Sequence, residues 1–183
     1  MGNIVVTEFI TLDGVVQDPN LWSFPYATLE TGQFKFAELQ AQGAHLLGRV
    51  TYAGFAQAWP SRTDAMGFSD RFNALPKYVV STTLQKAEWQ GSTILRGADL
   101  PAEIAQVKAA IDGDLIVAGS ATLVQSLMQH NLVDEYRLLT YPLVLGEGRR
   151  LFGRAPARLQ LLEQRPMGST GVVLLRYAPA PAA

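Results

Sequence analysis

Residues 115–130 read LIVAGSATLVQSLMQH, a short apolar run that passes through Gly119-Ser120 into a stretch with helical spacing. The run at 115–118 has the length and the branched side chains of a buried strand. After it, four apolar side chains share one face of a helix, namely Leu123, Val124, Leu127 and Met128. A buried strand that leads directly into an amphipathic helix is the repeating unit of an α/β protein.

The same alternation continues through most of the chain. Short apolar runs that predict strands occur at 4–10, 44–47, 78–80, 93–95, 115–118, 136–141, 159–162 and 172–177. Helical spacing occurs between them at 28–42, 51–58, 101–111 and 121–130. Strands that alternate with helices predict a mostly parallel sheet covered on both faces, that is, a three-layer α/β/α architecture.

The pattern changes after residue 155. Leu159 and Leu161 alternate with polar neighbours, residues 167–171 have the composition of a loop, and the next apolar run follows without room for a helix. This predicts an antiparallel C-terminal hairpin at the end of the mostly parallel sheet. We expect one domain over 1–178 and a disordered Ala-Pro tail at 179–183.

Composition excludes several classes of protein. The 183 residues include 15 basic and 16 acidic side chains, a net charge of −1, and no cysteine. A nucleic-acid-binding protein usually has a basic surplus, so we expect no nucleic-acid partner. His45 and His130 lack metal-ligand spacing, so we expect no metal site. Because neither a signal peptide nor a membrane-spanning run is evident, we expect a cytoplasmic protein without a membrane partner.

Three strand ends share one kind of chemistry. Residues 48–51, 81–83 and 119–122 each follow an apolar run and offer small or hydroxyl side chains and free backbone N–H groups. The first and third also open a helix, whose N-terminus attracts anions. Each junction alone is an ordinary cap or turn. Because ligands of open α/β sheets bind beyond the carboxyl ends of strands, the three together favour a dinucleotide, with Arg49 as a phosphate contact.

The loop after the first strand contains Asp13-Gly14. Asp13 is either a plain turn residue or an acidic or orienting group beside a bound nicotinamide. Trp22, Phe24 and Tyr26 follow, and these aromatic side chains either stack on a flat ligand or pack a core. Arg149-Arg150 either binds a substrate phosphate or is solvated.

Six motifs resemble those of the dihydrofolate-reductase-like family that includes the reductase domain of bifunctional riboflavin-biosynthesis deaminase-reductases. The resemblance spans residues 3–177. The motifs are 11–14 (TLDG), 46–52 (LLGRVTY), 77–84 (KYVVSTTL), 117–123 (VAGSATL), 132–135 (LVDE) and 142–152 (PLVLGEGRRLF). The resemblance implies a dihydrofolate-reductase-like sheet that binds NADPH, often as a homodimer and without a metal. The zinc-binding deaminase half is absent from this chain.

The resemblance also implies roles for individual residues. Cofactor phosphates would contact Gly48, Arg49 and Thr51, and the adenosine ribose would lie near Ser81 and Thr82. The pyrophosphate and nicotinamide side would be enclosed by Gly119, Ser120, Ala121, Thr122 and Leu123. Thr11, Asp13 and Gly14 would form the loop over nicotinamide and substrate. Many relatives carry Arg where Thr82 stands, so the preference for NADPH over NADH is open.

From these features we predict an NADPH-dependent reductase that transfers a hydride to a small heterocyclic or sugar-derived molecule. It would resemble 5-amino-6-(5-phosphoribosylamino)uracil reductase of riboflavin biosynthesis. Asp13 is the first candidate for the proton donor and Glu38 the second, because a carboxyl group in a dry pocket can have a raised pKa. The alternative is a non-catalytic nucleotide- or ligand-binding dimer on the same fold.

Overall fold

A computed structural model describes residues 2–153 and 156–181. Eight strands form one sheet in the order β4-β3-β2-β5-β1-β6-β8-β7. All eight predicted strands are confirmed. Their bounds are β1 Ile4–Thr11, β2 Gln42–Gly48, β3 Lys77–Val80, β4 Ser92–Leu95, β5 Asp114–Ala118, β6 Glu135–Tyr141, β7 Leu159–Pro166 and β8 Val173–Pro179.

Most of the sheet is parallel, and its last two strands reverse direction. β1 runs parallel to both β5 and β6. β8 pairs antiparallel with β6 and with β7, so the predicted C-terminal hairpin is confirmed. β8 extends to Pro179, and the N–H of Ala180 donates to the carbonyl of Arg158 at 2.9 Å. These two residues of the predicted tail therefore pair with the sheet, and 182–183 lie outside the described residues.

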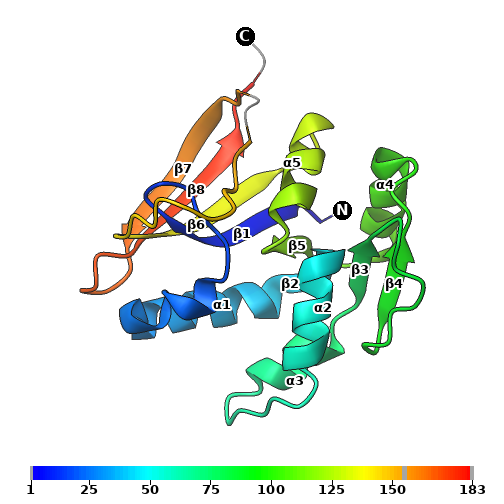
Figure 1. The fold of residues 1–183 in the computed structure, drawn as a ribbon, viewed down its shortest axis with the longest axis horizontal. Helices are drawn as coiled ribbons and strands as arrows, with labels where there is room; N and C mark the ends of the chain where they lie inside the picture. The colour runs from blue at the N-terminus through cyan, green and yellow to red at the C-terminus, as the bar shows by residue number, and fades with distance from the viewer. Residues whose placement is uncertain (1, 154–155, 182–183) are drawn as a thin grey trace.

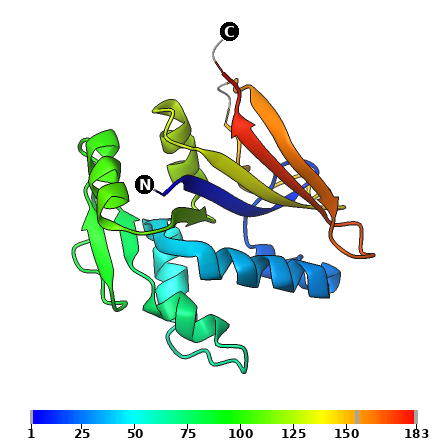
Figure 2. The ribbon, with the colours of Figure 1, turned by 180° about the vertical axis from the view of Figure 1, so that it is seen from behind.

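Helices cover both faces of the sheet (Figures 1 and 2). Alternate β1 residues face opposite ways: Ile4 and Val6 join one core with side chains of α4 and α5, and Phe9 packs with Phe34 of α1 in another. Side chains of α2 and α3 pack on Leu47 and Val79. The three-layer architecture is thus confirmed. The helices are α1 Leu29–Ala41, α2 Arg49–Ala58, α3 Phe68–Ala74, α4 Leu100–Ala110 and α5 Ala121–Gln129.

Helix α3 was not predicted. It is only seven residues long, and the carboxylate of Asp64 begins it by accepting hydrogen bonds from the N–H groups of Phe68 and Ser69 at 2.9 and 2.6 Å. Its first turn therefore depends on a side chain four residues upstream, which helical spacing does not reveal. No helix in the described part of the chain is long and apolar enough to cross a bilayer.

The position of the site follows from how β1 and β5 connect to the rest of the sheet. β1 leads through α1 to β2, whereas β5 leads through α5 to β6, and these two helices lie on opposite faces (Figure 1). Neighbouring strands whose connections diverge in this way form a topological switch point, where ligands of open α/β sheets bind. Pairing between the two strands ends at Thr7 and Ala118, although β1 continues to Thr11. Beyond these two residues the strands are no longer paired, and the ligand crevice typical of such sheets would lie between their ends.

Candidate functional site

The junctions after β2 and β5 form one hydrogen-bonded unit. The N–H of Gly48 donates to Ser120 Oγ at 2.9 Å, and the N–H of Ser120 donates to Thr51 Oγ1 at 3.0 Å. Residues more than 60 positions apart in the chain thus hold the starts of α2 and α5 together. The two helix N-termini, each with unpaired backbone N–H groups, therefore face the same region.

Gly119 allows the junctions after β2 and β5 to pack closely against each other. Its φ is +73°, in the left-handed region, and a Cβ there would lie 3.0 Å from Thr51 Cγ2 and 3.1 Å from Thr51 Oγ1. A larger residue would therefore be strained and would also displace Thr51. The close packing of Gly119 on Thr51 explains why this sequence has glycine directly after β5.

The middle junction lies in a neighbouring cavity of about 590 Å³. Predicted residues Arg49, Ser81 and Thr82 line this cavity, and so does Arg96, which the sequence analysis missed. Ser81 Oγ accepts hydrogen bonds from the N–H groups of the turn that follows it, so its own role is partly structural. Arg49 is exposed and forms no ion pair within the described residues. The cavity thus presents two guanidinium groups suited to an anionic ligand.

The start of α5 divides into buried and accessible positions. Ala121 and Leu123 are buried in the core that α4 and α5 share with the sheet, so only their backbone is available to a ligand. Thr122 is exposed, and its Oγ1 accepts a hydrogen bond from Arg149 Nη1 at 3.1 Å. Arg149 therefore brings a cation to the helix N-terminus from a loop 27 residues further along the chain.

Asp13 holds two loops together. Its carboxylate accepts hydrogen bonds from Thr11 Oγ1 at 2.5 Å and from the N–H groups of Leu145 and Gly146 at 3.3 and 2.8 Å. The Thr11 hydroxyl and these N–H groups lower the pKa of Asp13 to about 2. An ionised and fully engaged carboxylate disfavours the predicted proton-donor role and gives Asp13 a positioning role. Gly14, with φ +84°, forms the adjoining turn.

Glu38 of α1 is buried, with 6% of its surface exposed. Its Oε2 forms an ion pair with Lys35 and accepts a hydrogen bond from Thr7 Oγ1 at 3.0 Å. Its Oε1 lies 3.4 Å from Arg137 Nη1. Two cations and a hydroxyl thus surround this buried carboxylate and occupy both of its oxygens, which gives Glu38 a structural role in an ion-pair network.

The aromatic cluster belongs mainly to the core. Trp22 and Tyr26 pack edge-on against Tyr141, with ring centroids 5.2 and 5.8 Å apart. Phe24 is 71% exposed. These aromatic side chains were expected either to stack on a flat ligand or to pack in a core. The structure places Trp22 and Tyr26 in a core.

Comparison with known proteins agrees with this arrangement. A family model described as the RibD C-terminal domain matches residues 3–173. The chain belongs to the RibD C-terminal domain family. It is 26% identical over 178 residues to the uncharacterized protein YyaP of Bacillus subtilis (strain 168), with 95% of this chain and 93% of YyaP covered.

Two solved structures have the fold of this RibD C-terminal domain. RibD of Acinetobacter baumannii is similar with a TM-score of 0.70 and 16% identity over 98% of this chain, which spans 58% of that protein. Dihydrofolate reductase of Enterococcus faecalis, complexed with NADP(H), has a TM-score of 0.65 and 14% identity, with 98% of both chains covered. The predicted dihydrofolate-reductase-like fold is thereby confirmed.

One further residue of this RibD C-terminal domain lies at the switch point and was missed. Glu8 is 5% exposed, the N–H of Gly119 acts on its carboxyl group, and its Oε1 has no hydrogen-bond partner among the described residues. Burial raises the pKa of Glu8 well above its usual value. The sequence does carry a signal, because Glu8 is the one charged residue in the apolar run 4–10.

Proposed function

We propose that the protein is an NADPH-dependent reductase that transfers a hydride to a small heterocyclic or sugar-derived acceptor. The observation that carries the proposal is the hydrogen-bonded unit of Gly48, Thr51 and Ser120 beside a cavity with two arginines. Membership of the RibD C-terminal domain family supports it. The acceptor class is that of 5-amino-6-(5-phosphoribosylamino)uracil, and the protein would work in the cytoplasm as a homodimer without nucleic-acid or membrane partners.

The residues present fit a dinucleotide. A diphosphate beside the glycines at 48 and 119 would approach the N-termini of α2 and α5, where backbone N–H groups and the helix dipoles stabilise negative charge. Arg149 would add a cation at the second of these helices. The bound cofactor supplies the hydride. The protein would hold donor and acceptor in contact and exclude water, which is how such enzymes accelerate transfer.

Calorimetric titration with NADPH and with NADH, followed by an assay with 5-amino-6-(5-phosphoribosylamino)uracil, tests the proposal. We expect saturable binding of NADPH and oxidation of NADPH that depends on the pyrimidine. Binding without turnover on this acceptor or on pterin and quinone acceptors would favour the non-catalytic alternative. Absence of heat with either coenzyme would contradict both. Light scattering of the same sample measures the oligomeric state.

Arg49 and Arg96 should set the preference for NADPH. We expect Arg49→Ala and Arg96→Ala each to raise the Kd of NADPH about tenfold while changing the Kd of NADH less, since a guanidinium contributes about 1.4 kcal/mol to a phosphate contact. Calorimetry at fixed salt measures both constants. Arg62→Ala is the control, because Arg62 lies over the Trp59 ring and away from the cavity lining. If the two substitutions weakened the binding of NADPH and NADH equally, the 2′-phosphate would not bind in this cavity.

A further inference from the structure

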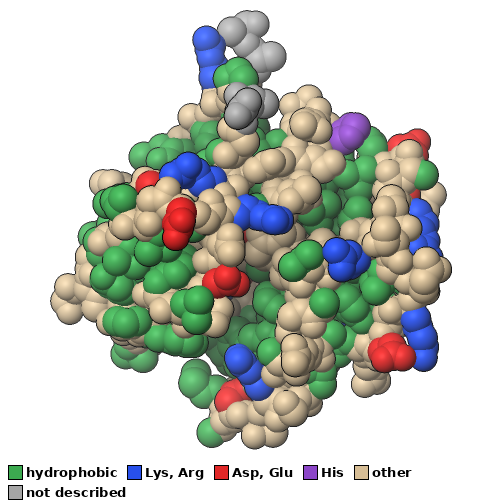
Figure 3. All heavy atoms as spheres, in the orientation of Figure 1, with side chains coloured by type: hydrophobic (Ala, Val, Ile, Leu, Met, Phe, Trp, Pro, Cys, Tyr) green, Lys and Arg blue, Asp and Glu red, His purple; other side chains and the backbone are tan. Residues whose placement is uncertain are grey.

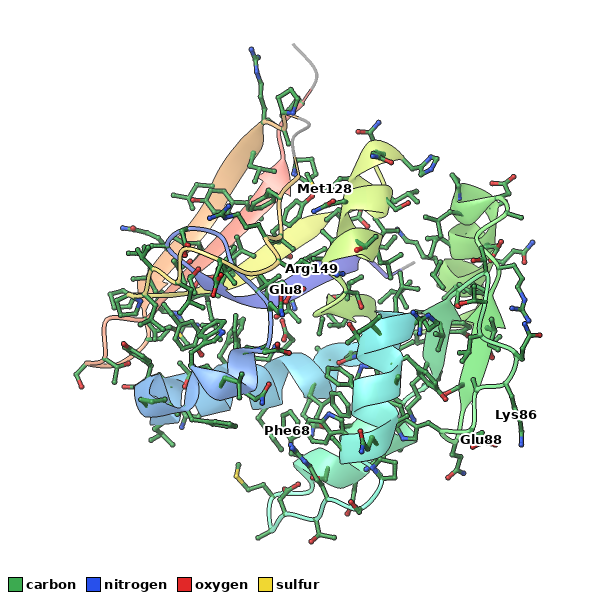
Figure 4. All side chains as sticks on the ribbon, in the orientation of Figure 1. Glu8, Phe68, Lys86, Glu88, Met128 and Arg149 are labelled. Atoms are coloured by element: carbon green, nitrogen blue, oxygen red, sulfur yellow. The ribbon has the colours of Figure 1, made fainter. Side chains whose placement is uncertain are left out.

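Glu8 is the first β1 residue beyond the point where β1 and β5 separate. The last paired residues are Thr7 and Ala118, and the chain then turns away from β1 at Gly119. Glu8 therefore lies at the switch point, which is where a ligand of this sheet would bind. Figure 4 labels Glu8 and Arg149, and both reach the start of α5 from distant parts of the chain.

The carboxyl group of Glu8 is only partly satisfied. The Gly119 N–H acts on it and lowers its pKa, but Oε1 is buried and has no hydrogen-bond partner in the described part of the chain. A buried polar atom without a hydrogen bond is costly, and such atoms in native proteins are associated with catalytic or ligand-binding roles. A hydrogen-bonding atom of a ligand bound at the switch point would satisfy Oε1.

The charges around Glu8 do not offset its burial. The charged groups that act on it are Lys35 and Glu38 of α1, which have opposite signs and are paired with each other. Their effects on Glu8 oppose each other, so burial dominates and favours the uncharged acid. Glu8 thus differs from Asp13 and Glu38, whose carboxylates are held by hydrogen bonds and by cations. Of these three carboxyl groups, only Glu8 forms no ion pair and has an unpaired oxygen among the described residues.

We propose that Glu8 is the proton donor of the reductase reaction, in the role first predicted for Asp13 and Glu38. This rests on the proposed function. Glu8 Oε1–H gives its proton to the nitrogen or oxygen of the acceptor's C=N or C=O bond, while the carbon of that bond receives hydride from C4 of the reduced nicotinamide. The C=N or C=O π pair becomes the new N–H or O–H bond. Glu8 is left as a carboxylate, and solvent reprotonates it when product leaves.

Infrared spectroscopy of the ligand-free protein provides the first test. The carbonyl stretch of a protonated carboxylic acid is distinct from that of a carboxylate. We expect this band at pH 7 in the wild type, its loss in Glu8→Gln, and its retention in Glu88→Gln, which removes an exposed glutamate. In the wild type the band should disappear only at a pH well above the usual range for glutamate, a result that needs no variant. Absence of the band at pH 7 would overturn the proposal.

Ligand binding and turnover provide the second test. Adding NADPH should shift the Glu8 band, because the crevice fills beside it. With 5-amino-6-(5-phosphoribosylamino)uracil as acceptor, Glu8→Gln should bind NADPH with a Kd within about twofold of the wild type and transfer hydride about 100-fold more slowly. The wild-type rate should fall as pH rises through the pKa of Glu8, and the Glu8→Gln rate should not.

The outcomes separate the two proposals. An unmoved band on NADPH binding, or a Glu8→Gln rate and pH profile equal to those of the wild type, would overturn the role of Glu8 and leave the reductase intact. A wild type that shows the band but binds no NADPH would instead overturn the proposed function, and the donor role with it.

Discussion

Gly119→Ala should weaken NADPH binding about 100-fold and lower the free energy of unfolding by about 2 kcal/mol. A residue with a Cβ costs about 1–2 kcal/mol in the left-handed conformation. The new Cβ would also lie 3.0 Å from Thr51 Cγ2 and force Thr51 to move. Because Thr51 Oγ1 accepts the hydrogen bond of the Ser120 N–H, this movement would separate the two junctions. Calorimetry with NADPH and urea unfolding measure the two effects.

Gly54→Ala is the matched control. Gly54 lies inside α2, and apart from its chain neighbours and the helix backbone no atom of the described residues lies within 4 Å of where its Cβ would be. We expect Gly54→Ala to stabilise the protein by about 0.5–1 kcal/mol, since alanine favours a helix over glycine, and to leave the Kd of NADPH unchanged. If Gly119→Ala bound NADPH as tightly as Gly54→Ala does, the joined junctions would not be the dinucleotide site.

The strands and four of the helices could be predicted because their signal is local. An apolar run such as 115–118 is buried on both faces by the helices of a parallel sheet, so its composition alone identifies it. The convergence of Gly48 and Gly119 could also be expected, since the carboxyl ends of neighbouring parallel strands meet at one edge of the sheet. The hydrogen bonds that join them were not predictable, because they depend on the turn geometry at Ser120.

The roles of the carboxyl groups could not be predicted, because each depends on partners that are distant in sequence. Asp13 is held by N–H groups 132 and 133 residues away. Glu38 meets Arg137, 99 residues further on. Sequence position made both of them candidates for the proton donor and gave Glu8 no role, whereas the hydrogen bonds and cations of the structure favour Glu8.

The distribution of charged side chains on the surface is only partly predictable from composition. On the face shown in Figure 3, basic and acidic side chains are interspersed and no patch of one sign dominates. Arg49, Arg96 and Arg149 are exposed, yet the chain has a net charge of −1. Local clusters of cations can therefore form beside a ligand site without a basic surplus, which is why net charge excludes a broad nucleic-acid surface but not an anion site.

His45→Gln should remove a strong pH dependence of stability. His45 is 2% exposed, its Nδ1 lies 2.7 Å from Gln42 Nε2, and its Nε2 lies 3.2 Å from the carbonyl oxygen of Phe72. These partners suit a neutral ring that accepts from Gln42 and donates to Phe72, and protonation would remove the acceptor. Burial lowers the pKa of His45 to about 4. Lys77 and Arg71 lower it further, while the Phe72 carbonyl opposes the shift.

Proton linkage gives the direction in which the free energy of unfolding changes with pH. Between pH 4 and 6.5 the unfolded chain binds a proton at His45 and the folded chain does not, so the free energy of unfolding falls as pH falls through this window. The full loss is about 3 kcal/mol, and about 2 kcal/mol of it appears between pH 7 and pH 5. Glu8, whose folded pKa is raised, contributes the opposite slope. It does so equally in the wild type and in His45 variants, so their difference isolates His45.

Urea unfolding of the wild type, His45→Gln and His130→Gln at pH 7 and pH 5 measures this effect. His130 is the other histidine of the chain and is exposed, so His130→Gln should retain the wild-type dependence. Between the two pH values, His45→Gln should lose about 2 kcal/mol less stability than either. Because the comparison uses the change with pH, a constant destabilisation by the glutamine side chain does not affect it. Equal changes in all three proteins would mean that His45 is protonated in the folded state, and that the Gln42 contact does not depend on a neutral ring.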